Sequence, residues 1–276
     1  MKIEASDVKR LAQSRGLEVL QPAELTDPDF NGKLFAYNAE LFCVVAFRIL
    51  PQVVFAMPPR GTVNLHASLL PKYRGAAPIN WAIIRGERET GLTTFFIRRQ
   101  VDSGDIIMQE KAPIGPDETF GELHDEMADL GGELLVNTID AIESGTVRVV
   151  KQDSAEATNA PKLLPEHGNI DWTRSAVEIH NLIRGLSPKP AAYTFRRGKK
   201  LLVVRSRLGR IAASQISAPG RVIEAEPQKG ITVSTGAGSV ELLKVRPESG
   251  KTISGAEYVR GYRLTKGEVL EKIIGE

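Results

Sequence analysis

The chain has 276 residues, of which 42% are hydrophobic and 25% charged, a composition typical of a globular protein rather than a disordered one. Its longest apolar run, residues 41–47, is far too short to span a membrane, and the first ten residues lack the apolar core of a secretory signal. The single cysteine, Cys43, excludes an intrachain disulfide, and we expect it to be a small buried hydrophobic residue within that run. These features predict a cytoplasmic protein with no membrane partner.

The net charge of +2 is unevenly distributed along the chain. Residues 1–150 contain 15 Lys and Arg against 21 Asp and Glu, whereas residues 151–276 contain 21 against 13. The first part therefore carries a net charge of −6 and the second a net charge of +8. A basic C-terminal half is suited to bind a polyanion such as RNA, although solvated surface charges would explain the same excess.

The first half of the chain alternates predicted helices with predicted strands, which is typical of an α/β fold on a mostly parallel sheet. Helices are expected at residues 6–16, 27–38, 80–85 and from Thr119 to about Ile142, the last opened by a capping box of Thr119 and Glu122. Strands are expected at residues 17–20, 41–47, 63–66, 92–97 and 106–110. The strand at 41–47 is apolar on both faces, which predicts a buried central position.

The character of the sequence changes near residue 150. Residues 151–167 are polar and contain Pro161 and Pro165, which predicts a linker between a domain at 1–150 and a second at 168–276. A helix is expected at residues 175–186, followed by short strands at 201–208, 221–225, 231–235 and 240–245 with glycines between them. Short strands at this spacing predict a small OB-like antiparallel barrel.

The residues that carry chemistry concentrate at 63–79 and 101–105. Asn64 and His66 are two residues apart in a predicted strand, so their side chains share one face. A histidine transfers protons near neutral pH, a carboxylate such as Asp102 can orient it, and an amide can stabilise an oxyanion. Ser68 is near, but no serine or cysteine is an obvious nucleophile, which favours acyl transfer to a nucleophile of the substrate. One histidine with one distant aspartate is a poor metal-ligand set, so no metal is expected.

Three segments resemble the folate-dependent formyltransferase family: NLHASLLPKYRGAAPINWAI, GLTTFFI and VDSGDII. Two later segments, APKLLPEHGNIDW and IHNLIRGLSPKPAAYT, resemble the family's entry into its C-terminal domain. The resemblance covers essentially the whole chain. It implies a Rossmann-like sheet followed by an OB-like barrel.

The resemblance also implies roles for individual residues. Asn64 would hold the formyl oxygen, His66 would relay a proton from the attacking amine, and Asp102 would orient His66. The donor would be 10-formyltetrahydrofolate, and the residues expected to line its site are Ser68, Leu69, Leu70 and Pro71. In members that resemble this chain to its C-terminus, the acceptor is the α-amine of methionine on initiator tRNA. The residues expected to contact that tRNA are Arg196, Arg197, Lys199 and Lys200. We expect the chain to be a monomer.

Two departures from the family leave alternatives open. The family begins with a strand–helix–strand unit that precedes the region matched here, so we expect an N-terminally truncated sheet. At Phe47 and Arg48, many relatives carry Tyr-Gly beside the pterin pocket. One alternative is a folate-dependent enzyme that formylates a small amine or hydrolyses the formyl group. Another is a non-catalytic fragment that binds RNA through residues 166–276.

Overall fold

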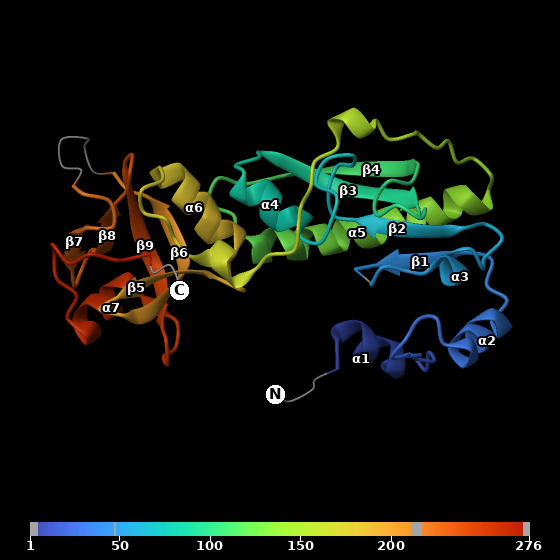
Figure 1. Cartoon of the computed structure of the whole chain (residues 1–276), viewed down its shortest axis with the longest axis horizontal. Coiled ribbons are helices and arrows are strands. Elements are labelled where there is room, and N and C mark those ends of the chain that lie inside the picture. The colour runs from blue at the N-terminus through green and yellow to red at the C-terminus, as the bar shows by residue number, and fades with distance from the viewer. Residues whose placement is uncertain (1–4, 47, 211–216, 273–276) are drawn as a thin grey trace.

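The computed structural model describes residues 5–46, 48–210 and 217–272, and Figure 1 shows two units side by side. The first unit is an α/β layer. Its elements are α1 (Asp7–Ser14), α2 (Pro28–Ala36), β1 (Phe42–Val45), α3 (Gln52–Phe55), β2 (Thr62–His66), α4 (Pro78–Ile84), β3 (Glu89–Phe96), β4 (Ile106–Pro113) and α5 (Phe120–Glu143). No helix in these ranges is both long and apolar enough to cross a membrane.

The first sheet is mixed, with the strand order β1-β2-β3-β4. β1 and β2 pair in parallel, whereas β2 with β3 and β3 with β4 pair antiparallel. The α/β class is therefore confirmed, but the parallel pairing is limited to β1 and β2. β3 and β4 are joined by residues 97–105, a loop without a helix, and a parallel pair needs a longer crossover connection.

Helix α5 covers the sheet with the apolar stripe that the sequence predicts. Its buried face includes Leu123, Met127, Leu134 and Ile142, at intervals of four, seven and eight residues, which correspond to one or two helical turns. The capping box of Thr119 and Glu122 is present at its start. The helix lies close to β2, because a Cβ added at Gly131 would be 2.9 Å from Leu65 Cδ2. The packing of α5 thus fixes the sheet whose strand β2 carries Asn64 and His66.

The strand predicted at 41–47 differs from expectation. It is shorter, covers Phe42–Val45, and alternates between partly exposed and exposed residues. Cys43 is exposed, so the prediction of a buried thiol is wrong, and Val45 is 53% exposed. Within the described ranges β1 pairs with β2 alone, and a strand is buried only where other elements cover it. Phe47 lies outside the described residues, and residues 17–20 form no strand.

The second unit is antiparallel. Its elements are α6 (Ala176–Gly185), β5 (Ala192–Arg196), β6 (Lys199–Leu208), β7 (Val222–Glu226), β8 (Gly230–Ser234), β9 (Ser239–Pro247), β10 (Ile253–Ser254) and α7 (Gly255–Tyr262), and the segment that connects the units contains the short helices η1 (Ser154–Glu156) and η2 (Pro165–Gly168). The strand order is β5-β6-β9-β8-β7, and β10 pairs with β9. Bridges from Phe195 to Glu271 and from Arg221 to Val269 place residues 267–271 between β5 and β7. This segment closes the sheet, which confirms the predicted barrel.

Helix α6 joins the two units by packing on α4 (Figure 1). Asn80 Nδ2 donates to the Gly185 carbonyl oxygen at 2.7 Å. His180 is buried between the units, with Nδ1 3.0 Å from Ser206 Oγ and Nε2 3.2 Å from the Pro116 carbonyl oxygen. Burial lowers the pKa of this imidazole, because desolvation disfavours its charged form. His180 is therefore a structural residue of the contact between the units.

Candidate active site

The end of β2 presents two polar side chains on one face. Asn64 is partly exposed, and His66 is only 7% exposed. In the register with β3, Asn64 lies opposite Phe95 and His66 opposite Thr93. Among the residues that the structure describes, none hydrogen bonds to the Asn64 side-chain amide. The amide is thus free to donate to a substrate oxygen.

His66 faces an oxygen atom at each ring nitrogen. Nε2 lies 2.9 Å from the Tyr73 carbonyl oxygen, and Nδ1 lies 3.8 Å from Asp102 Oδ2. A carbonyl oxygen can only accept a hydrogen bond, so the neutral ring carries its proton on Nε2. Nδ1 is then the basic nitrogen. A proton arriving there creates an imidazolium beside a carboxylate that is only 8% exposed, where water screens their attraction weakly.

Asp102 is held in an unusual backbone conformation by contacts on both sides. Its φ is +50°, a left-handed value that non-glycine residues rarely adopt. Gly75 N donates to its Oδ2 at 2.8 Å, and Gln152 Nε2 donates to its carbonyl oxygen at 2.9 Å. Gln152 was not predicted as a site residue, because no local pattern distinguishes it from its polar neighbours. Nowhere in the described ranges do three or more His, Cys, Asp or Glu side chains gather as metal ligands.

The four residues predicted to line the folate site belong to a tight turn after β2. The Ser68 hydroxyl donates to a carbonyl within that turn at 2.7 Å, and its own carbonyl accepts from Thr93 Oγ1 at 2.6 Å. Leu70 is buried in a small apolar cluster, whereas Leu69 and Pro71 are partly exposed. Because the Ser68 hydroxyl is engaged in the turn, it is a structural group rather than a nucleophile.

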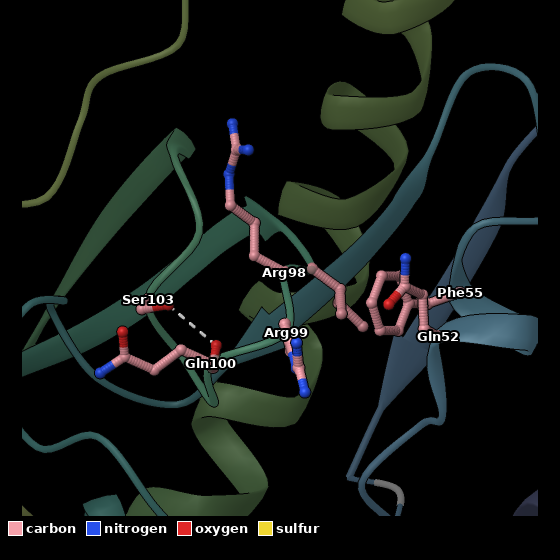
Figure 2. Close-up of a pocket in the computed structure, with 7 residues that line it drawn as sticks. Gln52, Phe55, Arg98, Arg99, Gln100 and Ser103 are labelled. Atoms are coloured by element: carbon pink, nitrogen blue, oxygen red, sulfur yellow. Dashed lines mark hydrogen bonds between the residues drawn. The ribbon is translucent and has the colours of Figure 1, made fainter.

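A shallow cavity of about 580 Å³ lies between α3 and the loop that follows β3, a volume within the usual range of ligand sites. Figure 2 shows Gln52 and Phe55 on one side of it and Gln100 and Ser103 on the other. The lining residues are Gln52, Phe55, Ile97, Arg98, Arg99, Gln100 and Ser103. Ser103 directly follows Asp102, so one loop supplies both a wall of this cavity and the carboxylate that faces His66. Sequence reasoning missed these lining residues, although Gln100 and Ser103 flank the predicted aspartate.

The four basic residues predicted to contact RNA have different surroundings. Arg196 is 7% exposed and forms a bidentate ion pair with Glu268, at 2.9 and 3.0 Å. Its guanidinium is therefore occupied inside the barrel, which corrects the expectation that it faces RNA. Arg197 and Lys199 are exposed, and Lys200 is partly exposed with Nζ 3.7 Å from the centre of the Tyr193 ring.

Fold and site together define a class: a mixed α/β sheet with an Asn–His pair at a strand end, an aspartate facing the histidine, and an attached β-barrel. Residues 1–139 match the family model described as formyl transferase, and residues 162–263 match that of the formyl transferase C-terminal domain. The chain belongs to the formyl transferase family.

Two relatives within this family share a single name and are similar to almost the whole chain. The chain is 45% identical over 264 residues to a protein of Moorella thermoacetica named methionyl-tRNA formyltransferase, covering 95% of this chain and 84% of the relative. It is 43% identical over 267 residues to the protein of the same name from Solibacter usitatus, covering 96% of this chain and 84% of that relative. The chain thus spans most of the length of both.

Solved structures share the fold. The methionyl-tRNA formyltransferase from Clostridium thermocellum superimposes with a TM-score of 0.55 and 20% identity, over 74% of this chain and 88% of that one. HypX from Aquifex aeolicus, solved in complex with tetrahydrofolic acid, gives a TM-score of 0.66 and 20% identity, over 88% of this chain and 42% of that one. At this identity the structural likeness establishes the fold alone.

Proposed function

We propose that this chain transfers the formyl group of 10-formyltetrahydrofolate to the α-amine of methionine carried by initiator tRNA. The observation that carries the proposal is the approach of Asp102 to the ring of His66, on the strand face that also presents Asn64. The relatives of Moorella and Solibacter support the choice of acceptor. The excess of basic residues after residue 150 supports it as well, because tRNA is a polyanion.

In this mechanism, the lone pair of the amine forms a bond to the formyl carbon, and the carbonyl oxygen becomes an oxyanion. Asn64 donates its amide N–H to that oxygen, and the partial charge of the amide stabilises the developing negative charge. His66 accepts the proton that the attacking nitrogen releases, and Asp102 stabilises the resulting imidazolium. Breaking the carbon–nitrogen bond to the donor then restores the carbonyl, and His66 returns its proton to the departing nitrogen.

The proposal also gives binding roles to the residues around Asn64, His66 and Asp102 and to the basic residues of the barrel. The cavity beside Ser103 is open and mixed in polarity, which suits the ring and amide groups of a folate. Leu69 and Pro71, partly exposed in the turn after β2, would contact the folate as well. Arg197, Lys199 and Lys200 would bind tRNA phosphates. A monomer in the cytoplasm, where initiator tRNA is charged and used, completes the proposal.

The test is formyl transfer from 10-formyltetrahydrofolate to methionyl-tRNA, followed with a labelled formyl group. We expect turnover by the 276-residue chain, lowered by about 10²–10⁴ in His66→Ala and by about 10²–10³ in Asn64→Ala. His124→Ala, which changes an exposed histidine on α5, is the matched control and should keep full activity. Binding of tRNA should be unchanged in all three variants, because the catalytic groups and the basic residues lie in different units.

Two results would contradict the proposal. Equal loss of catalysis and tRNA binding in His66→Ala would show that the variant is misfolded or that the roles are wrongly assigned. Transfer to a small amino sugar without transfer to methionyl-tRNA would retain the chemistry but reject the acceptor.

A further inference from the structure

The segment at residues 151–167, predicted as a linker, contacts both loops of the candidate active site. Figure 1 shows it crossing the first unit from the end of α5 to α6. Ala160, in its middle, is fully buried in the core of the first unit. The segment is therefore part of the first unit's structure in addition to being a connection between the units.

Residues 158–160 hold the loop that follows β2. Thr158 Oγ1 accepts from Tyr73 N at 2.8 Å, and the Thr158 carbonyl oxygen accepts from Arg74 N at 2.8 Å. Ala160 N donates to the Arg74 carbonyl oxygen at 2.7 Å. Tyr73 has a φ of +60°, which a bulky residue adopts only where its surroundings fix it, and these three hydrogen bonds provide that constraint. The Tyr73 carbonyl is the group that accepts from His66 Nε2.

Gly75 shows how closely the linker segment approaches this loop. Its φ is +122°, and a Cβ added there would lie 2.6 Å from the Ala160 carbonyl oxygen. Only glycine therefore permits the contact. The N–H of the same residue donates to Asp102 Oδ2 at 2.8 Å, so the close approach also places a donor on the catalytic carboxylate.

Gln152, near the start of the linker segment, joins the two loops to each other. It is 6% exposed, and its Nε2 donates to the carbonyl oxygens of Asp102 at 2.9 Å and Gly104 at 2.7 Å. Its Oε1 accepts from Arg74 Nε at 3.1 Å and Nη2 at 2.6 Å. The Gln152 side chain is thus hydrogen bonded to Arg74 in the loop that follows β2 and to two carbonyls in the loop of Asp102. These bonds set the spacing between the two loops.

We propose that Gln152 and Thr158 are positioning residues, which hold the Asp102 carboxylate and the Tyr73 carbonyl on opposite nitrogens of His66. Neither side chain contacts the histidine, so each acts through the loop to which it is hydrogen bonded. The inference rests on the proposed function for its kinetic test, but the geometry of His66 can be measured without any substrate.

The kinetic test compares Thr158→Val with Thr158→Ser. Thr158 is an exposed residue whose hydroxyl oxygen accepts from the Tyr73 N–H at 2.8 Å. Valine preserves the shape of the side chain but removes this acceptor, whereas serine retains the hydroxyl. We expect kcat to fall about 10-fold to 10²-fold in Thr158→Val with KM for both substrates unchanged, since small misplacements of catalytic groups cost rate. Thr158→Ser should recover most of the loss. Ser154→Ala, an exposed change in the same linker segment, should be neutral.

Gln152→Glu extends the test to the second loop, because it keeps an acceptor for Arg74 but removes both N–H donors. We expect a fall in kcat of the same order as for Thr158→Val. Circular dichroism and thermal unfolding of each variant verify that the chain is folded.

The ring nitrogens of His66 provide the readout that does not depend on activity. In ¹⁵N-labelled protein, the wild type should show the tautomer with its proton on Nε2, and Thr158→Val should shift the signals toward a mixture of tautomers. Unchanged His66 signals together with unchanged kcat in Thr158→Val would overturn the inference. If the wild type transfers no formyl group but the ring signals still shift, the positioning role stands and the proposed function fails.

Discussion

The ion pair between Arg196 and Glu268 should be a principal source of stability for the barrel. It joins β5 to the segment that closes the sheet, and both side chains are largely buried, with 7% and 14% of their surface exposed. The guanidinium also donates to the carbonyl oxygens of Tyr262 at 2.9 Å and Arg263 at 3.3 Å, where α7 ends. Glu268→Gln therefore leaves a buried cation without its counter-charge.

The size of the effect follows from the pKa of Glu268. The hydrogen bonds from Arg196 and then from the Thr265 backbone lower that pKa from 4.5 to about 2. At about 1.4 kcal/mol for each pKa unit, the ionised form is stabilised by about 3 kcal/mol. The glutamine carbonyl would still accept one hydrogen bond, so we expect Glu268→Gln to lower the free energy of unfolding by about 2–3 kcal/mol.

The assay is urea unfolding at pH 7, followed by the fluorescence of Trp172, which lies in the core of the second unit. A Trp81→Phe background removes the only other tryptophan, which belongs to the first unit. Because the folded-state pKa of Glu268 is depressed, its contribution is complete above about pH 4.5 and is lost as the pH falls through about 2. The wild type should lose this part of its stability in acid, and Glu268→Gln should not.

Glu248→Gln is the matched control, since Glu248 is exposed and forms no ion pair among the described residues. It should change the free energy of unfolding by less than about 0.5 kcal/mol. If Glu268→Gln is no more destabilising than this control, or if both proteins lose stability in parallel between pH 4.5 and 2, the reasoning from the ion pair is refuted.

Three further predictions concern other parts of the chain. Gly75→Ala should lower the free energy of unfolding by about 1–3 kcal/mol and also lower kcat, because the new methyl group meets the Ala160 carbonyl. Urea unfolding and initial rates measure these two effects, and an unchanged kcat would argue against the close approach. Arg205→Ala removes an exposed ion pair with Glu122 between the two units and should cost less than about 1 kcal/mol in thermal unfolding, so a larger loss would give that pair a greater role in holding the units together. Lys199→Ala should weaken tRNA binding and reduce the slope of log K against log salt by about 1, and an unchanged slope would remove Lys199 from the proposed RNA surface.

The sequence alone determined the features that depend on local periodicity and local hydrogen bonding. The two-residue period of a strand places Asn64 and His66 on one face, wherever that strand lies in the sheet. The capping box of Thr119 and Glu122 forms within one turn, and the spacing of the apolar residues after it defines the buried face of α5. The order of these motifs also identified the family, since residues 1–139 and 162–263 match its two models.

Only the tertiary structure decided what covers each face and which distant groups meet. An apolar strand has the same sequence pattern at the edge of a sheet as in its middle. The exposure of Cys43 therefore depends on the neighbours of β1, which the pattern does not specify. The sequence does not distinguish a basic residue that faces solvent from one that faces a buried carboxylate. For this reason Arg196 was predicted to contact RNA although it pairs with Glu268. Gln152 and Thr158 reach their partners across 50 and 85 residues. Contacts at such separations are created by the path of the folded backbone, and no local pattern in the sequence encodes them.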